Sequence, residues 1–307
     1  MAVTLQEIAR ALGGEVHGNQ VLAPGPGHSR KDRSLSVRLS DATPDGFVVF
    51  SHAGDDWRAC RDHVADALNL PRDRWRTQCD PDPVEVKRRL EARQRAERRE
   101  REAVLRRQRR AREICREGRD PRGEIPEAYL ISRGLCLPAE IAGDSLFYHP
   151  TCPWETGTAP AMVAPLRDVL TGKIVGAHRT ALTPDGRKID RKMLGTAMNA
   201  AVMLDPLRAI SGTLHVAEGI ETALAGRQNY GLTPIWALGT SGAIAALPVL
   251  PNVQTLVIAA ENDGGASAKA IEAVGTRWHA AGRTIEIIRP PQGAKDLNDA
   301  ILRGAAA

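Results

Sequence analysis

The stretch "VIAAENDGGA" at residues 257–266 joins a short apolar run directly to two acids and then to two glycines. Short continuous apolar runs are typical of strands that are covered on both faces of a parallel sheet. In open sheets of this kind, ligands bind outside the carboxyl ends of the strands. We therefore expect Glu261 and Asp263, which follow the run, to belong to a site at one edge of such a sheet.

The last hundred residues alternate between strand-like and helix-like segments on both sides of this stretch. Strands are predicted in "TLHVAEG", "TPIWALG", "QTLVIAAEND" and "TIEIIRP", with helical segments between them, and "KDLNDAIL" follows the last strand. Such an alternation is typical of βα units and predicts an α/β fold with a parallel sheet.

Two further acids occupy comparable places: Glu218 ends the first of these strands, and Asp296 follows the last. Carboxylates that are held together repel one another, and their pKa values rise unless a cation is present. Hard oxygen ligands beside glycine-rich turns suit Mg²⁺ or Mn²⁺, and two such ions can assist phosphoryl transfer. The alternative for any one of these acids is a helix N-cap, which is a common role.

The charge of the chain is concentrated in one segment. Residues 84–119 hold 15 Lys or Arg against 7 Glu, a local charge of +8, whereas all 307 residues together carry +5. The segment predicts one long helix because it consists of helix-favouring residues without Gly or Pro up to Glu117. It is a solvated spacer with Glu–Arg pairs, a helix that binds phosphate through Arg106, Arg107, Arg109 and Arg110, or both.

The rest of the composition excludes several classes. No apolar run reaches the roughly 18 residues that a membrane span needs, and the N-terminus has no secretory pattern, so we expect a cytoplasmic protein. The five cysteines are dispersed and form no CxxC pair, which favours free thiols: Cys60, Cys79, Cys115, Cys136 and Cys152. Four parts are predicted, residues 1–80, an Arg-rich linker at 81–120, an α+β part at 121–210, and the βα array at 211–307.

The motifs "VAEGIETAL", "VIAAENDGGA" and "KDLNDAI" together resemble the Toprim fold, which primases, topoisomerases and certain nucleases share. The resemblance covers about residues 212–302. It implies that Glu218 is a catalytic acid/base or an additional metal contact, and that Glu261, Asp263 and Asp296 bind metal. Glu261 stands where the family has Asp, which retains the carboxylate on a side chain longer by one methylene.

The segments "EAYLISRGLCLPAEIAGDSLFYHP" and "LTGKIVGAHRTALTPDGRKIDRKMLG" resemble the core that precedes the Toprim domain in bacterial replicative primases. This resemblance implies that Arg179 and Lys192 are catalytic cations facing nucleotide phosphates or template. Lys295, beside the late acid, is expected to face phosphate. The alternative for Arg179 is a cation on a strand surface.

Residues 1–80 are similar to the zinc ribbon of such primases in the rhythm of "APGPGHSRKDRSLSV" and "GFVVFSHAGDD". Only His28 matches a zinc ligand, Ala23 stands at a cysteine position, and no cysteine pair follows. Structural zinc needs four ligands, so no zinc is expected. Arg30, Lys31 and Arg33 remain as candidate contacts to nucleic acid.

The resemblance implies a DNA primase of the phage, plasmid or mobile-element kind, which makes short RNA primers from NTPs on single-stranded DNA with Mg²⁺ or Mn²⁺. No GxxxxGK[ST] motif is present, so a separate helicase or replication ATPase is the expected partner, and no membrane is expected. Two alternatives stay open: a Toprim nuclease that uses the same acids, and a non-catalytic nucleic-acid binder with a decayed site.

Overall fold

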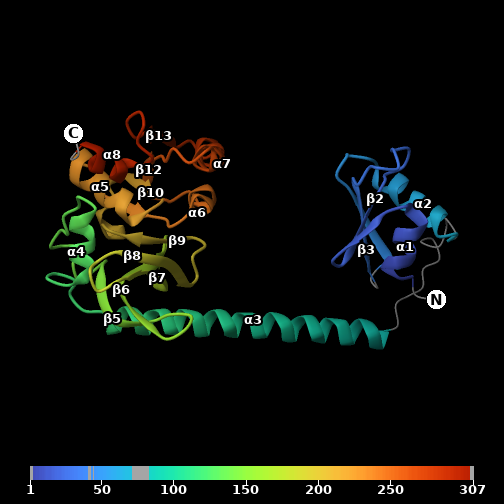
Figure 1. Ribbon diagram of the computed structural model, residues 1–307, viewed down its shortest axis with the longest axis horizontal. Coiled ribbons are helices and arrows are strands. Elements are labelled where there is room, and N and C mark those ends of the chain that lie inside the picture. The colour runs from blue at the N-terminus through green and yellow to red at the C-terminus, as the bar shows by residue number, and fades with distance from the viewer. Residues whose placement is uncertain (1–2, 41–42, 44, 71–82, 305–307) are drawn as a thin grey trace. The chain divides into compact units, whose positions relative to one another are not determined.

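The computed structural model describes residues 3–40, 43, 45–70 and 83–304. Its contacts separate the chain into two compact units, Met1–Gln94 and Arg95–Ala307. The boundary falls inside one long helix, α3 (Pro83–Glu117). Each unit is described by itself, with the element labels of Figure 1.

The first unit is a small antiparallel sheet of four strands in the order β1-β2-β3-β4. Two helices pack on it and share a core that includes Ile8, Val37 and Val64. Strands β1 and β2 form an antiparallel hairpin that precedes β3 and β4. The elements are α1 (Leu5–Leu12), β1 (Glu15–His17), β2 (Gln20–Ala23), β3 (Leu35–Leu39), β4 (Phe47–Ser51) and α2 (Trp57–Ala67).

The second unit is built on one nine-stranded sheet, in the order β13-β12-β10-β11-β9-β6-β7-β8 with β5 beside β6. The strands from β10 onward pair in parallel, as predicted, whereas β9 pairs antiparallel with both β11 and β6. The strands are β5 (Phe147–Pro153), β6 (Thr158–Asp168), β7 (Ile174–Leu182), β8 (Lys188–Gly195), β9 (Ala200–Met203), β10 (Gly212–Ala217), β11 (Ile235–Ala237), β12 (Val253–Ala259) and β13 (Thr284–Ile288).

Helices cover both faces of this sheet. One face carries α4 (Ile125–Ser132), α5 (Ile220–Tyr230) and α8 (Leu297–Gly304) over a core that includes Leu130, Leu166 and Leu224. The other face carries α6 (Ser241–Ala246) and α7 (Ala266–Ala280), with Trp236 and Trp278 fully buried beneath them. The short 3-10 helix η1 (Leu207–Ala209) lies between β9 and β10. The expected α/β class, with parallel strands preceded by an α+β region, is therefore confirmed.

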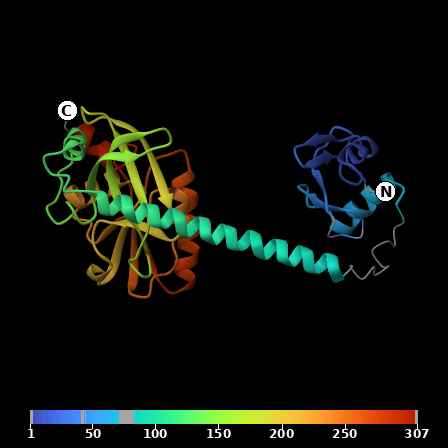
Figure 2. The same ribbon diagram turned by 90° about the horizontal axis from the view of Figure 1, so that it is seen from below.

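The last turns of α3 pack on the same face as α6 and α7, against β6 and β7. Ala111, Ile114 and Cys115 are buried there with Val163 and Ala177, and Figure 2 shows α3 running along this side of the strands. Earlier in the helix the described side chains are mostly exposed. Among the side chains of α3 that the structure describes, those of the last turns are the ones buried in an apolar cluster.

Candidate functional site at the carboxyl ends of the parallel strands

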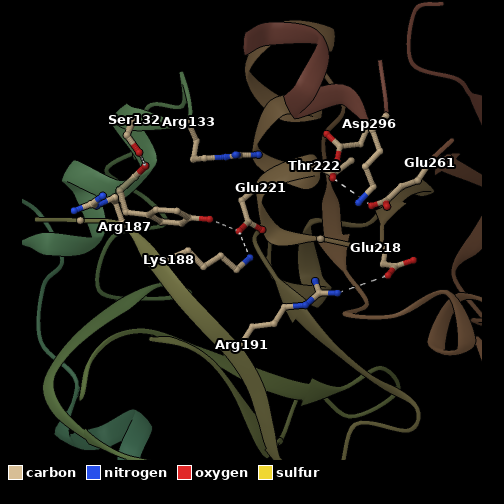
Figure 3. A pocket seen from close by; sticks show the side chains of 14 residues that line it. Ser132, Arg133, Arg187, Lys188, Arg191, Glu218, Glu221, Thr222, Glu261 and Asp296 are labelled. Carbon is tan, nitrogen blue, oxygen red and sulfur yellow. Dashed lines mark hydrogen bonds and ion pairs between the residues drawn. The ribbon is translucent and has the colours of Figure 1, made fainter. Parts of the chain in front are cut away.

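The acids of the Toprim-like motifs gather because β10 and β12 are neighbours in register. Ala217 pairs with Ala259, so the two strands end side by side, and Glu218 and Glu261 follow them at the same edge of the sheet. Figure 3 shows these two carboxylates with Asp296 around one cavity of about 480 Å³. Asp263 is not part of the cavity lining, but its charge acts on both Glu218 and Glu261.

Hydrogen bonds from Asn262 hold Asp296 close to Glu218 and Glu261. The backbone N–H of Asn262 donates to the carbonyl oxygen of Lys295 at 2.7 Å, and its side-chain amide donates to that of Ala294 at 2.8 Å. The loop that carries Asp296 is therefore fastened to the loop that carries Glu261. Sequence reasoning did not single out Asn262, although its place between two acids marks it as a polar residue of the same turn.

Two of the acids also stabilise helix N-termini. The carboxylate of Asp263 accepts the backbone N–H of Ser267 at 3.0 and 3.1 Å in the first turn of α7. Oδ1 of Asp296 accepts the N–H of Asp299 at 2.8 Å at the start of α8. The capping alternative therefore describes part of what these residues do. These carboxylates can still bind a further partner, because each has about four lone-pair positions.

The electrostatics of the cluster are those of crowded carboxylates. Burial, followed by the charges of Glu218 and Asp296, raises the pKa of Glu261 to about 7, and Lys295 only partly offsets this. Burial also raises the pKa of Glu218, where Asp263 adds to the effect and Arg191 opposes it. Glu261 therefore lacks enough nearby positive charge to ionise fully near neutral pH.

A divalent cation fits this cluster in ligand type and in charge. Oxygen-only donor sets suit Mg²⁺ or Mn²⁺, and a cation would relieve the repulsion that raises the pKa of Glu261. Within the described part of the chain, no three His, Cys, Asp or Glu side chains are already spaced to hold a metal. Small side-chain movements would therefore accompany binding.

The opposite wall of the cavity is cationic and comes mainly from β8 and its preceding turn. Nζ of Lys188 lies 3.0 Å from Oε1 of Glu221, and Arg191 lies 3.9 Å from Glu218. Arg133 and Arg187 complete this wall, whereas Lys295 lies among the acids. The cavity thus places a wall of carboxylates opposite a wall of cations, both within the second unit (Figure 3).

The structure does not bring Arg179 and Lys192 to the carboxylates. They pair across β7 and β8, and both cations lie over the ring of Trp154, at 5.1 and 5.7 Å from its centre. Arg179 donates to the carbonyl oxygen of Pro153 at 2.6 Å, and Lys192 pairs with Glu155 at 2.5 Å. This is the face that α3 covers, and the predicted contact of both residues with phosphate stays a prediction.

Lys188 and Arg191 are two of the four cavity cations that sequence reasoning missed, although they stand in the same quoted segment as Arg179 and Lys192. Side chains alternate between the faces of a strand, so Arg191 and Lys192 point to opposite sides. A register irregularity opposite Leu182 leaves Ile189 without a partner and lets Lys188 share the face of Arg191. The expected Lys295 does line the cavity, and its role toward phosphate stays a prediction.

In the first unit, His28 lies in a network of acids and hydroxyls. Its Nδ1 is 3.1 Å from Asp32, and its Nε2 is 3.1 Å from Asp55. Arg30 and Lys31 are exposed, whereas Arg33 pairs with Glu15 at 2.8 Å and donates to backbone carbonyls. Binding of nucleic acid by these residues, and the expected lack of zinc, stay predictions.

The four arginines singled out on α3 are all exposed. Arg107 pairs with Glu100 at 3.2 Å, and Arg110 pairs with Glu113 at 3.3 Å. Among the residues that the structure describes, Arg106 and Arg109 have no ion-pair partner. Both features expected of the helix, Glu–Arg pairs and uncompensated cations, therefore occur side by side.

No described helix combines the length and the apolar character that a membrane crossing requires.

Comparison with known proteins assigns the two halves of the second unit differently. Residues 105–204 match the model of a domain of unknown function (DUF7146), and residues 213–307 match the model of the Toprim domain. None of the curated proteins matches the chain.

One similar solved chain comes from a structure described as bacteriophage T7 lagging-strand DNA polymerase interacting with primase domains of two gp4 subunits bound to an RNA/DNA hybrid and dTTP. Its identity is 19%, its TM-score is 0.41, and the match covers 57% of this chain and 85% of that one. A likeness of this size does not establish a common fold. The family match, together with the acids at the ends of β10 and β12 and before α8, identifies residues 213–307 as a Toprim domain.

Proposed function

We propose that this protein is a primase: a metal-dependent nucleotidyltransferase that makes short RNA primers from NTPs on single-stranded DNA. The observation that carries the proposal is the cavity, in which the Toprim carboxylates, with Lys295 among them, face Lys188 and Arg191. A cavity of about 480 Å³ lies in the usual range for small-molecule sites. Phosphoryl transfer needs both walls, because cations bind the triphosphate while carboxylates hold the metal.

Glu261, Asp263 and Asp296 would hold Mg²⁺ or Mn²⁺, which when bound neutralises charge on the phosphates and on the attacking and leaving oxygens. Lys188, Arg191 and Lys295 would bind and orient the triphosphate through charge-assisted hydrogen bonds. Glu218, at the end of β10, would accept the proton of the attacking hydroxyl. The exposed cations of α3 and of the first unit would hold the template backbone.

The resemblance to replicative primases supports the choice of reaction within the Toprim proteins. It also supports a separate helicase or replication ATPase as the partner, and a role in the replication of a phage, plasmid or mobile element. The rival reading as a nuclease uses the same carboxylates, so the products must separate the two.

The test uses the full chain with circular single-stranded DNA, labelled NTPs and Mn²⁺, and resolves products by length. Short RNA products support the proposal, and Glu218→Gln should lower their yield by at least about 100-fold. Glu272→Gln is the matched control, because Glu272 is exposed on α7 outside the cavity. Cleavage of the circle without NTPs would identify a nuclease, and template binding without either product would identify a non-catalytic binder.

A further inference from the structure

Glu221, in the first turn of α5, lies at the base of the cationic wall and has no role in the proposed reaction. Its Oε1 accepts two donors, the Tyr129 hydroxyl at 2.5 Å and the Lys188 ammonium at 3.0 Å. The Glu221 side chain is 14% exposed and that of Lys188 is 34% exposed. Three elements, α4, α5 and β8, therefore meet at one carboxylate oxygen.

This carboxylate is buried yet kept charged. Burial opposes its ionisation, but the Lys188 ammonium and the Tyr129 hydroxyl outweigh that effect and lower the pKa of Glu221. Tyr129 is 3% exposed and packs in the main core, so its hydroxyl is a fixed donor. Glu221 is thus a rigid anion, in contrast to the crowded acids of the other wall.

The ion pair with Glu221 restricts the orientation of the Lys188 side chain. A lysine side chain has four rotatable bonds and loses much conformational entropy when it is ordered. Glu221 occupies one of the three donors of the ammonium group, which leaves two for other acceptors in the cavity. A cation that is ordered before its ligand arrives binds more tightly, because the ordering cost has already been met within the fold.

We propose that Glu221, held by Tyr129, is a positioning residue that aims Lys188 at the phosphate groups of a nucleoside triphosphate in this cavity. The inference rests on the proposed function for the identity of the ligand. Its rival is that Glu221 competes with the phosphates for Lys188. The two readings predict opposite signs, because a competitor weakens binding of the nucleotide and a positioning residue strengthens it.

The experiment measures binding of ATP with Mg²⁺ to the full chain by calorimetry, without template. Lys188→Gln should raise the Kd roughly tenfold to hundredfold, as expected for loss of a charged hydrogen-bond donor. Glu221→Gln should raise it about three- to tenfold and Tyr129→Phe about two- to threefold, since each loosens Lys188 without removing it. The Lys188→Gln, Glu221→Gln double variant should lie within about twofold of Lys188→Gln, because Glu221 acts through Lys188.

Two controls separate positioning from damage to the fold. Glu272→Gln and Tyr148→Phe make the same changes at an exposed and at a buried residue outside the cavity, and both should leave the Kd unchanged. In primer synthesis, Glu221→Gln should raise the KM for NTPs with kcat within about twofold, a split that general destabilisation would not produce.

Tighter binding by Glu221→Gln, additive effects in the double variant, or no ATP binding by the unmodified chain would each overturn the inference. If the binding cycle behaves as expected and no primers form, the inference stands and the proposed reaction fails. If primers form but the binding effects are additive, the reaction stands and the inference fails.

Discussion

The His28 network of the first unit and the Glu261 cluster of the second are both built from acids, yet their acids are satisfied very differently. Around His28, Asp32 accepts the Ser34 hydroxyl at 2.5 Å, and Asp55 accepts the Ser51 hydroxyl at 2.8 Å. Around Glu261, the hydrogen bond from the Thr222 hydroxyl is long, 3.5 Å, and the largest charge effects on the pKa of Glu261 come from Glu218 and Asp296.

The pKa shifts of the two clusters favour opposite charge states. The Ser34 hydroxyl is the main cause that lowers the pKa of Asp32, and the hydrogen bond with Asp32 is the main cause that raises that of His28. Both shifts favour the charged forms. In the Glu261 cluster, burial and repulsion disfavour the charged form. Acids whose charges are matched by donors and cations stabilise the fold around them. Crowded acids without such partners are stabilised when a ligand binds, and the predictions below test that distinction.

The largest effect is expected from Asp263→Asn. Asparagine caps a helix about as well as aspartate, so the bond to Ser267 is kept while the charge is removed. If Asp263 served only α7, activity would be nearly unchanged. We expect primer synthesis to fall at least about 100-fold with the melting temperature almost constant, which assigns the residue to the metal. Full activity would instead show that Asp263 serves only to cap α7.

The second effect is on stability against pH. The pKa of Glu261 is raised from 4.5 to about 7, so its contribution is favourable while it is protonated and is lost as pH rises through about 7. Without metal, the second unit should lose up to roughly 3 kcal/mol between pH 4.5 and pH 8. Denaturation followed by fluorescence of the buried Trp236 and Trp278 measures this loss.

Glu261→Gln is the matched variant for that measurement, because it cannot ionise and should show a flatter pH dependence. Added Mg²⁺ should restore stability at pH 8 in the unmodified chain and less so in the variant. If Mg²⁺ gives no stabilisation at pH 8, the acids are not a metal site.

A smaller effect, of about tenfold in affinity, is expected on α3, which carries both kinds of arginine. Replacing Arg106 and Arg109, which have no ion-pair partner among the described residues, by Gln should flatten the salt dependence of single-stranded DNA binding. The slope should change by about 0.7 units for each phosphate that is no longer neutralised. Replacing the Glu-paired Arg107 and Arg110 should change it less. Equal slopes for both variants and the unmodified chain would leave α3 as a solvated spacer.

The smallest effect is expected at His28. Its raised pKa contributes stability that is present below its unfolded value of 6.5 and is lost as pH rises through the folded value. Cys60 is fully buried in the same unit, so its rate of thiol labelling, followed by mass spectrometry, reports on opening. Relative to the labelling rate of the unfolded chain at the same pH, labelling should accelerate above pH 6.5, and it should not respond to a zinc chelator. Acceleration by the chelator, or one equivalent of bound zinc, would contradict the metal-free interpretation.

The place of the acids could be predicted from the sequence, because each acid stands next to a strand or helix whose pattern is visible in a short segment. Continuous apolar runs that alternate with helices indicate parallel strands, and parallel strands end at a common edge. Glu218 and Glu261 therefore had to meet once β10 and β12 were neighbours, and both line the cavity. Asp296 also lines it, although the bonds of Asn262 that hold its loop were not predictable from pattern.

The cationic wall was not predictable for a physical reason. β8 is an edge strand whose residues are all exposed or half-buried, so hydrophobic alternation does not reveal which face each side chain takes. A shift of one residue changes the face, and this separates Arg191 from Lys192. The irregularity at Ile189 then changes the alternation again and brings Lys188 back to the cavity.

The antiparallel pairing of β9 with β11 limits how this protein can be cut and recombined. The strand pair Trp236–Met203 and Ala237–Val202 crosses the border between the two matched families. A Toprim domain excised at that border would keep its carboxylates, but it would lose every cation of the cavity except Lys295 and would expose the edge of β11. For the design of chimeras, the smallest exchangeable piece is therefore the whole sheet, and a graft of the acidic half alone would yield a site that attracts metal without selecting a nucleotide.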